Sequence, residues 1–344
     1  MKLKNIAVLM GGISPEREVS LRSGKAVAQA LKNAGFNVFC IDVKDEKIKD
    51  LDDVKVDVAF IALHGYFGED GRVQQLLESK GTLYTGSGVN ASKLAMDKLA
   101  TKKCFINAGL KTPDYLVATE FQEFAEIQQA IRKFGLPVVL KPPQNGSSIG
   151  ISIIRDINDL KQGLTSAFKF GYELLIEKYV KGRELTVGIL DDKALPIIEI
   201  KPCAEFFSYE AKYQDNKTEY LVVETEQKNS ARTHEKLTCC TGALPPNLYA
   251  KAQKLAEDAH RVLGCNGFSR VDMLMNEEGD FYLLEINTIP GFTEKSLLPK
   301  AAHAAGISFP SLCRKIVELA AGDLLVSANK METQTDKKML DARI

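Results

Sequence analysis

Residues 270–287 read RVDMLMNEEGDFYLLEIN, which predicts a β-hairpin in which a few polar residues interrupt apolar strands. Successive side chains of a strand point to opposite faces. Arg270 and Asp272 therefore share one face, and Glu285 and Asn287 share one face. Two carboxylates, a guanidinium and an amide are thus candidates for a single polar surface.

The register of this hairpin decides whether the two polar faces coincide. If residues 277–280 form a four-residue loop, Asn276 pairs with Phe281 and the two carboxylates stand opposite each other. Neighbouring carboxylates repel each other unless a cation joins them, and Mg2+ takes few protein oxygens and completes its shell with water and phosphate oxygens. The pattern indicates a metal–nucleotide site, and a solvent-exposed face with weak ion pairs is the alternative.

The composition is that of a soluble enzyme. A chain of 344 residues is long enough for about two or three domains. The 45 lysines and arginines balance 45 aspartates and glutamates, so no net charge attracts nucleic acid or a membrane, and small molecules are the expected partners. The seven cysteines lack CxxC spacing and no apolar run approaches transmembrane length, so we expect a reduced, cytoplasmic protein.

The N-terminal part reads as a parallel, doubly wound α/β unit. An apolar strand at 6–10, a Gly-Gly turn and a helix that starts near Glu16 or Ser20 form a βα opening, and 56–63 is a second buried strand. A helical segment is predicted over 91–107.

A mixed module follows. It contains a helix at 121–134 and strands at 138–141, 149–154 and 174–177. Antiparallel strand signals then dominate from 184–200 through the hairpin at 270–287, which predicts an α+β arrangement in this part of the chain.

Two predicted strands end in residues whose side chains suit a nucleotide-binding site. Lys141 ends a strand, and the loop 146–148 after it offers backbone N–H groups and hydroxyls to an anion, although the spacing is not that of a Walker A motif. Glu177 and Lys178 end another strand, where a carboxylate could accept from ribose or adenine. For Glu177 and Lys178 the alternative is a surface ion pair.

Short motifs occur in one order along the chain: GGISPEREVS at 11–20, ALHG at 62–65, GEDG at 68–71, YTGSG at 84–88, MDK at 96–98, LPVVLKP at 136–142, GSSIG at 146–150, IEK at 176–178, YEAKY at 209–213, SRVD at 269–272, LEINTIPG at 284–291 and SLLPKAA at 296–302. In this order they closely resemble the D-alanine–D-alanine ligases of the ATP-grasp superfamily. The resemblance extends from Ile6 to about Leu319.

The resemblance implies an ATP-grasp fold that combines α/β and α+β parts. Its domains would be an N-terminal α/β substrate domain at 1–98, a central subdomain at 99–183, a C-terminal subdomain at 184–322 with a flap loop near 205–246, and a polar tail at 323–344. ATP would lie between the central and C-terminal antiparallel sheets, and the amino acids would face the N-terminal domain.

The resemblance also implies a reaction. The carboxylate of one D-alanine attacks the γ-phosphate of ATP to give D-alanyl phosphate, and the amine of a second D-alanine displaces phosphate through a tetrahedral intermediate. The product, D-alanyl-D-alanine, supplies peptidoglycan precursor synthesis. The family resemblance further implies two Mg2+ ions, for which Mn2+ can substitute, and a cytoplasmic homodimer.

The site residues are carried over position by position, each onto the matching motif. Catalytic roles are implied for Glu16, Ser147, Tyr213, Arg270 and Gly291. Substrate contacts are implied for Glu16, Val19, His64, Ser296 and Leu297. ATP contacts are implied for Lys98, Lys141, Ser147, Glu177, Lys178, Val180, Glu184, Lys212 and Asn287. Metal ligation is implied for Asp272, Glu285 and Asn287.

The residue types suit these roles. Lysines neutralise phosphate charge, and Arg270 with the N–H of Gly291 would stabilise an oxyanion. Glu16 would bind the ammonium of the first D-alanine, with a helix-capping acid as the alternative. His64 is assigned a supporting role, since a lone histidine is more often structural.

The chain departs from the family pattern at two places. Asn145 stands where relatives usually carry glutamate, which would soften the charge of the loop. The segment 222–246 is longer and more polar than in relatives and contains Cys239 and Cys240, which with His234 form a poor ligand set. It predicts an insertion on a mobile lid rather than part of a core.

Two other functions stay open beside D-alanyl-D-alanine synthesis. One is a D-alanine–D-lactate type of ligase, against which Tyr213 argues because relatives of that type usually replace the tyrosine. The other is a catalytically inactive nucleotide or dipeptide binder, against which the retained Lys141 and Arg270 argue.

Overall fold

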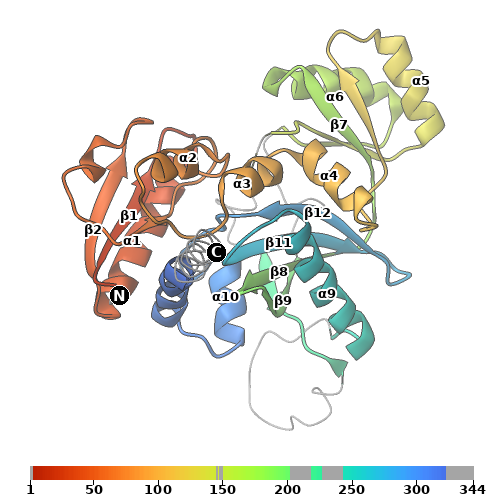
Figure 1. Ribbon diagram of the computed structural model, residues 1–344. Coiled ribbons are helices and arrows are strands. Elements are labelled where there is room, and N and C mark those ends of the chain that lie inside the picture. The colour runs from red at the N-terminus through yellow and green to blue at the C-terminus, as the bar shows by residue number, and fades with distance from the viewer. Residues whose placement is uncertain (1–2, 145, 147–149, 202–217, 227–242, 323–344) are drawn as a thin grey trace, which may run out of the picture.

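Three β-sheets form the framework of the protein in a computed structural model, which describes residues 3–144, 146, 150–201, 218–226 and 243–322 (Figure 1). The first sheet is parallel with strand order β2-β1-β3, the second is antiparallel with order β4-β7-β5-β6, and the third is antiparallel with order β10-β9-β8-β11-β12. The parallel unit followed by antiparallel sheets confirms the predicted fold class.

The parallel sheet has two buried strands, β1 and β3, and a partly exposed edge strand, β2. Its strands are β1 (Asn5–Gly11), β2 (Asn37–Val43) and β3 (Val58–Ile61), and α1 (Arg17–Asn33) joins the first two. Both predicted strands are confirmed, and α1 begins beside Glu16, as expected. Helix 309–322 returns to this core, where Leu312 and Ile316 are buried in one cluster with the strands of the sheet.

The helical region after this sheet is divided into α2 (Arg72–Ser79), α3 (Val89–Met96) and α4 (Lys98–Asn107). The helical segment predicted over 91–107 is therefore two helices, with a break that was not predicted. Asp97 is extended, and its Oδ1 accepts hydrogen bonds from the N–H groups of Leu99 and Ala100 at 2.9 and 3.0 Å. This N-cap makes Lys98 the first residue of a new helix.

The central sheet separates its two faces by strand alternation. Its strands are β4 (Tyr115–Thr119), β5 (Val138–Lys141), β6 (Ser152–Ile154) and β7 (Glu173–Lys178). The even-numbered positions of β5 and β7, such as Leu140 and Ile176, share one core with α5 (Phe124–Phe134) and α6 (Leu160–Ala167). The odd-numbered positions Lys141 and Glu177 therefore point away from these helices.

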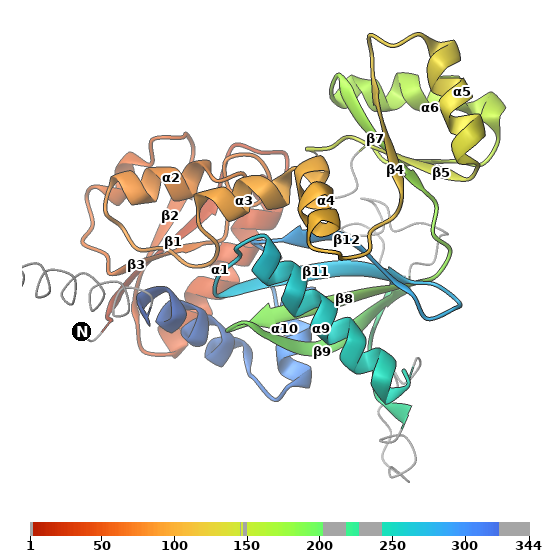
Figure 2. The ribbon, with the colours of Figure 1, turned by 45° about the vertical axis from the view of Figure 1, so that its right-hand side comes forward.

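The C-terminal sheet also has a helix on each face. Its strands are β8 (Arg183–Leu190), β9 (Lys193–Lys201), β10 (Glu219–Val222), β11 (Phe268–Met275) and β12 (Phe281–Asn287). The helix α9 (Pro246–Val262) packs on the face that carries Val187 and Ile197, and α10 (Leu297–Ala304) packs on the face of Ile198 (Figure 2).

Three aromatic rings connect the N-terminal and C-terminal parts. Phe292, in the loop between β12 and α10, makes edge contacts with Phe60 of β3 and Phe268 of β11, at centroid distances of 5.1 and 5.3 Å. All three are fully buried. The loop that leads into α10 is therefore fixed against both sheets.

The hairpin prediction reached the right pairing through a loop that is one residue off. Met275 rather than Asn276 pairs with Phe281, because the loop has five residues and Asn276 N–H donates to the carbonyl of Asp280 at 3.0 Å. A β-bulge between Asp272 and Met273, with Leu284 as the extra residue, then corrects the register. Asp272 lies opposite Glu285 and Arg270 opposite Asn287, as predicted.

The prediction that 222–246 lies outside the core is wrong for both ends of the segment. Val223 and Leu244 are buried in the core under α9, and Thr225 forms a β-bridge with Leu244. The apolar side chains at these ends explain the burial, since they continue the edge of the sheet. Residues 227–242, with Cys239 and Cys240, and the tail from 323 lie outside the described residues.

The three sheets occupy 5–61, 115–178 and 183–287, and the domain boundaries at 98, 183 and 322 stay a prediction. Within the part of the chain that the structure describes, no helix is long and apolar enough to cross a membrane.

Candidate active site

A cavity of about 450 Å3 lies between the central and C-terminal sheets. Its wall on the central side is the face of β5 and β7 that carries Lys141 and Glu177, and its wall on the other side comes from β8, β11 and β12. It is lined by most of the predicted ATP and metal residues that are described, namely Lys98, Lys141, Glu177, Lys178, Val180, Glu184, Asp272 and Glu285, and also by Arg270 and Leu297.

Positive side chains bind both carboxylates of the hairpin. Arg270 donates from Nε and Nη2 to the two oxygens of Asp272 at 2.9 and 2.7 Å, and the hydroxyl of Thr186 donates to Oδ1 of the same carboxylate at 2.5 Å. Lys98 Nζ lies 3.1 Å from Oε2 of Glu285. Positive and negative side chains thus alternate on the C-terminal side of the cavity, called its floor below. These ion pairs fix the two carboxylates in place.

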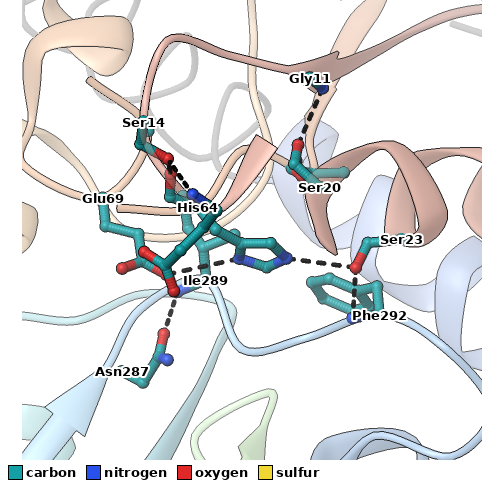
Figure 3. A network of polar contacts seen from close by, with 12 residues as sticks. Gly11, Ser14, Ser20, Ser23, His64, Glu69, Asn287, Ile289 and Phe292 are labelled. Atoms are coloured by element: carbon teal, nitrogen blue, oxygen red, sulfur yellow. Dashed lines mark hydrogen bonds and ion pairs between the residues drawn. The ribbon is translucent and has the colours of Figure 1, made fainter. Parts of the chain in front are cut away.

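The donor set of this floor fits a hard divalent cation. Asp272 and Glu285 supply carboxylate oxygens, and the amide oxygen of Asn287, at the end of β12, accepts the N–H of Ile289 at 2.9 Å with one lone pair left (Figure 3). Oxygen ligands suit Mg2+ and Mn2+. No group of three or more His, Cys, Asp or Glu residues that could hold a metal occurs among the described residues, so phosphate and water oxygens would have to complete the shell.

On the opposite wall, one carboxylate contacts the ammonium groups of two lysines. Glu177 is buried, with Oε2 2.5 Å from Lys141 Nζ and Oε1 2.8 Å from Lys102 Nζ. Burial by itself would raise the pKa of the Glu177 carboxyl, but the two lysines outweigh it and hold the pKa below its usual range. Glu177 is therefore ionised and holds Lys141 at the cavity wall.

His64 connects the N-terminal sheet to the loop before α10. Its Nε2 lies 3.2 Å from the hydroxyl of Ser23, which accepts the N–H of Phe292 at 3.4 Å, and its Nδ1 lies 3.5 Å from Glu69 Oε1 (Figure 3). The imidazole is buried and held on both sides. The geometry agrees with the supporting role predicted for His64.

Glu16 points toward the glycines of two loops. It occupies the N-cap position of α1 but makes no side-chain capping hydrogen bond, so the capping alternative is not supported. A Cβ atom on Gly65 would collide with Oε2 of Glu16, and one on Gly146 would lie 3.8 Å from it. The buried carboxylate therefore lies where the end of β3 meets the loop after β5. Val19 is half-buried one turn further along α1.

The N-terminus of α10 forms a second polar end of the site. The hydroxyl of Ser296 accepts the N–H of Thr293 at 3.1 Å and lies 2.8 Å from Thr293 Oγ1. A Cβ atom on Gly291 would lie 2.9 Å from the same hydroxyl, so a close approach explains the glycine. Ser296 is the N-cap residue and Leu297 the first residue of α10.

Comparison with known proteins identifies this arrangement. Residues 104–239 and 222–318 match the family model described as D-ala D-ala ligase C-terminus, and residues 44–87 match D-ala D-ala ligase N-terminus. The D-alanine–D-alanine ligase of Geotalea uraniireducens (strain Rf4) is 46% identical over 321 residues, which cover 93% of this chain and 97% of that protein. The chain belongs to the D-alanine–D-alanine ligase family.

Solved structures of the D-alanine–D-alanine ligase family share the fold over nearly the whole chain. The Bacillus anthracis D-alanine–D-alanine ligase complexed with ATP aligns with a TM-score of 0.78 at 35% identity, covering 95% of this chain and 99% of that one. The D-alanine–D-alanine ligase of Coxiella burnetii has the same TM-score at 23% identity, covering 98% and 100%, and shows the fold alone. The resemblance seen in the motifs is confirmed.

Three residues assigned from the D-alanine–D-alanine ligase resemblance, Ser147, Lys212 and Tyr213, lie outside the described residues, so their roles stay predictions. The carbonyl of Pro143, near the loop that carries Ser147, accepts the N–H of Lys98 at 3.0 Å. This contact places the start of α4 beside the residues that directly follow β5. Asn287 is the one described ATP or metal residue of the prediction that does not line the cavity.

Sequence reasoning missed several polar residues that the fold brings to this site. Arg183 and Glu199, neighbours across β8 and β9, form two hydrogen bonds of 2.9 and 2.8 Å at the cavity wall. Thr186 reaches Asp272 only because β8 pairs with β11. Lys102 had a usable signal, since it follows Lys98 by four residues and so lies on the same face of a helix.

Proposed function

We propose that the protein is an ATP-dependent ligase that joins two D-alanines into D-alanyl-D-alanine through D-alanyl phosphate, for peptidoglycan precursor synthesis. The observation that supports this most is the convergence of Lys98, Lys141 and Arg270 with the carboxylates Asp272 and Glu285 on one cavity. Such a cavity suits a triphosphate, because cations and metal-binding oxygens from two sheets face one another across it.

The first step is phosphoryl transfer, for which positioning and charge neutralisation suffice. Lys141 from β5 and Lys98 from α4 would neutralise the phosphate oxygens from opposite sides. Mg2+ or Mn2+, held by Asp272, Glu285 and Asn287, would supply charge stabilisation between phosphate oxygens. No nucleophilic side chain is needed, because the attacking group is the carboxylate of the first D-alanine.

The second step is attack by an amine on the acyl phosphate. Glu16 would hold the ammonium of the first D-alanine, and Ser296 with the N–H of Leu297 would hold the carboxylate of the second. Arg270 and the N–H of Gly291 would stabilise the oxyanion that forms, and phosphate would leave. His64 would keep the loop before α10 in place through Ser23.

Substrate pairs test the proposal directly. Phosphate release and mass spectrometry of the product would be measured with D-alanine, L-alanine, D-lactate and mixed pairs in the presence of ATP and Mg2+. We expect phosphate release and D-alanyl-D-alanine with D-alanine alone. A depsipeptide as the main product would favour the D-alanine–D-lactate reaction, and ATP binding without any product would indicate an inactive binder.

Several finer assignments belong to the same proposal. They are two metal ions per site, a homodimer, a cytoplasmic location and domains at 1–98, 99–183 and 184–322. The free thiols of Cys40, Cys265 and Cys313 are consistent with a reducing compartment. Light scattering coupled to size-exclusion chromatography tests the dimer, and a mass of about 38 kDa in solution, that of one 37.9 kDa chain, would contradict it.

A further inference from the structure

Lys102 is a fully buried lysine that does not face the cavity. It lies on α4, one turn after Lys98, and its Nζ donates to the hydroxyl of Thr112 at 2.6 Å and to the carbonyl of Pro113 at 2.8 Å. Its third contact is Glu177 Oε1 at 2.8 Å. All three hydrogens of the ammonium group therefore have acceptors, which a buried charge requires.

The carboxylate of Glu177 lies between two lysines and contacts each of them with a different oxygen. Glu177 presents Oε1 to Lys102 and Oε2 to Lys141, and it lies on β7, the strand between β4 and β5. The side chain of Glu177 is 3% exposed, that of Lys102 0%, and that of Lys141 11%. Lys141 and Glu177 line the cavity, with Lys141 the more exposed of the two, whereas Lys102 does not line it.

Charge decides what the arrangement does. Two ammonium groups and one carboxylate leave a net charge of one positive unit, and Lys141 carries it to the cavity wall. Without Lys102, the carboxylate of Glu177 would be neutralised by Lys141 alone, and this pair would have no net charge. Buried charges are only weakly screened by solvent. This difference in charge would therefore change the electrostatic interaction with a triphosphate several ångströms away in the cavity.

The helix α4 carries a second contact of the same kind. Lys98 and Lys102 are four residues apart and lie on one face of α4, where Lys98 binds Glu285 of β12 and Lys102 binds Glu177 of β7. In both views α4 lies between the central sheet and β12 (Figures 1 and 2). One helix therefore sets both walls of the cavity relative to each other.

We propose that Lys102 is a positioning residue of the nucleotide site: it holds and neutralises Glu177, so that the charge of Lys141 stays available for the phosphates of ATP. The inference rests on the proposed function for the identity of the nucleotide. It also gives Glu177 a role in addition to a direct contact with ribose or adenine, because each carboxylate oxygen is engaged by one lysine.

The substitution Lys102→Met in the full-length protein tests the proposal, with Lys103→Met as the matched control. Lys103 is the next residue of α4 and is exposed. The dissociation constant of ATP is measured by calorimetry without D-alanine, and KM is measured for each substrate. We expect Lys102→Met to weaken ATP binding about tenfold and to raise KM for ATP in parallel, with KM for D-alanine changed less than about twofold. Lys103→Met is expected to behave as the unmodified protein.

A double variant separates positioning from mere structural support. In the Lys102→Met/Glu177→Gln variant the wall again carries one positive charge, and the glutamine oxygen still accepts from Lys141. We expect it to recover most of the lost ATP affinity. Where Lys102→Met alone does not fold, the double variant, which has no buried carboxylate at position 177, carries the test. Recovery to within about threefold of the unmodified protein supports the proposal.

Two results would overturn the inference. One is a folded Lys102→Met variant whose ATP affinity is unchanged. A folded variant with lower thermal stability in which KM for ATP and KM for D-alanine rise by the same factor would count against the inference in the same way. The other is a folded double variant that binds ATP more than about threefold more weakly than the unmodified protein. Because ATP binding is measured without D-alanine, a protein that binds ATP but forms no dipeptide would refute the proposed ligation and leave this comparison intact.

Discussion

Arg270 binds the carboxylate two residues further along its own strand, with Nε 2.9 Å from Oδ1 and Nη2 2.7 Å from Oδ2 of Asp272. The two side chains share one face of β11, and the hydroxyl of Thr186 binds the same carboxylate. The proposed metal ligand and the proposed oxyanion donor are therefore in direct contact. Changes at either residue are expected to affect both functions, and the variants below are chosen to separate them.

Glu285→Gln should lower turnover on the order of a hundredfold and raise the Mg2+ concentration needed for half-maximal rate, because one proposed ligand loses its charge. The contact with Lys98 weakens as well, since an ion pair becomes a neutral hydrogen bond. A Mg2+ titration of the phosphate-release rate provides the measurement. Glu278→Gln, in the exposed loop of the same hairpin, is the control. An unchanged Mg2+ dependence would remove the metal assignment.

Arg270→Met should lower kcat by roughly 10² to 10³ while changing the affinity for ATP much less, because its target is an oxyanion that exists only during the reaction. Calorimetric ATP binding and steady-state kinetics are compared for the same preparation, together with a circular dichroism spectrum. Arg261→Met, on the exposed side of α9, controls for the loss of a surface arginine. Normal turnover by a folded Arg270→Met variant would refute the role.

Gly65→Ala should raise KM for D-alanine, since the new methyl group would displace the carboxylate of Glu16. Gly81→Ala is a matched control: both glycines have positive φ, +67° and +61°, but nothing lies within 4 Å of a Cβ atom on Gly81. Both variants should lose about 1 kcal/mol of stability through backbone strain. KM and thermal unfolding are measured for both. Equal KM values in the two variants would contradict the placement of Glu16.

Two buried thiols should resist alkylation in the folded protein. Burial raises the pKa of Cys265 to about 11 and that of Cys313 to about 12, whereas Cys40 is exposed. Iodoacetamide at pH 8 followed by peptide mass spectrometry should modify Cys40 first and the buried pair only after denaturation. Rapid labelling of Cys313 in the native protein would show that helix 309–322 opens readily.

The same thiols give stability a dependence on alkaline pH. Unfolded cysteines ionise near pH 8.5, whereas Cys265 and Cys313 stay protonated in the fold until about pH 11 and 12. Their contribution to stability is therefore complete below about pH 8.5 and is lost as the pH rises toward those values. Thermal unfolding measured from pH 8 to pH 10 should show a decline that is smaller in Cys265→Ala and Cys313→Ala variants.

Local periodicity was sufficient for the strands that carry most of the site and for the side chains that share a face, whereas β2 and β4 were not predicted. Because backbone geometry alone sends alternate side chains to opposite faces, Arg270 and Asp272 could be placed together from the sequence, and the strand ending at Lys141 could be located. The order of the motifs was sufficient for the family. The division of 91–107 could also have been read locally, from Asp97 as a capping residue.

Contacts between elements distant in sequence required the tertiary structure. The bulge at Leu284, which corrects the hairpin register, leaves no local mark in the sequence. Glu177 meets Lys102 and Lys141 only because three separate elements pack together, and Val223 is buried only because β10 completes an edge of the sheet under α9. Which residues could carry the chemistry followed from the amino-acid sequence alone, since side-chain type and strand period are local properties. Which charges neutralise one another was decided by tertiary packing, because an ion pair depends on distance in space and on burial.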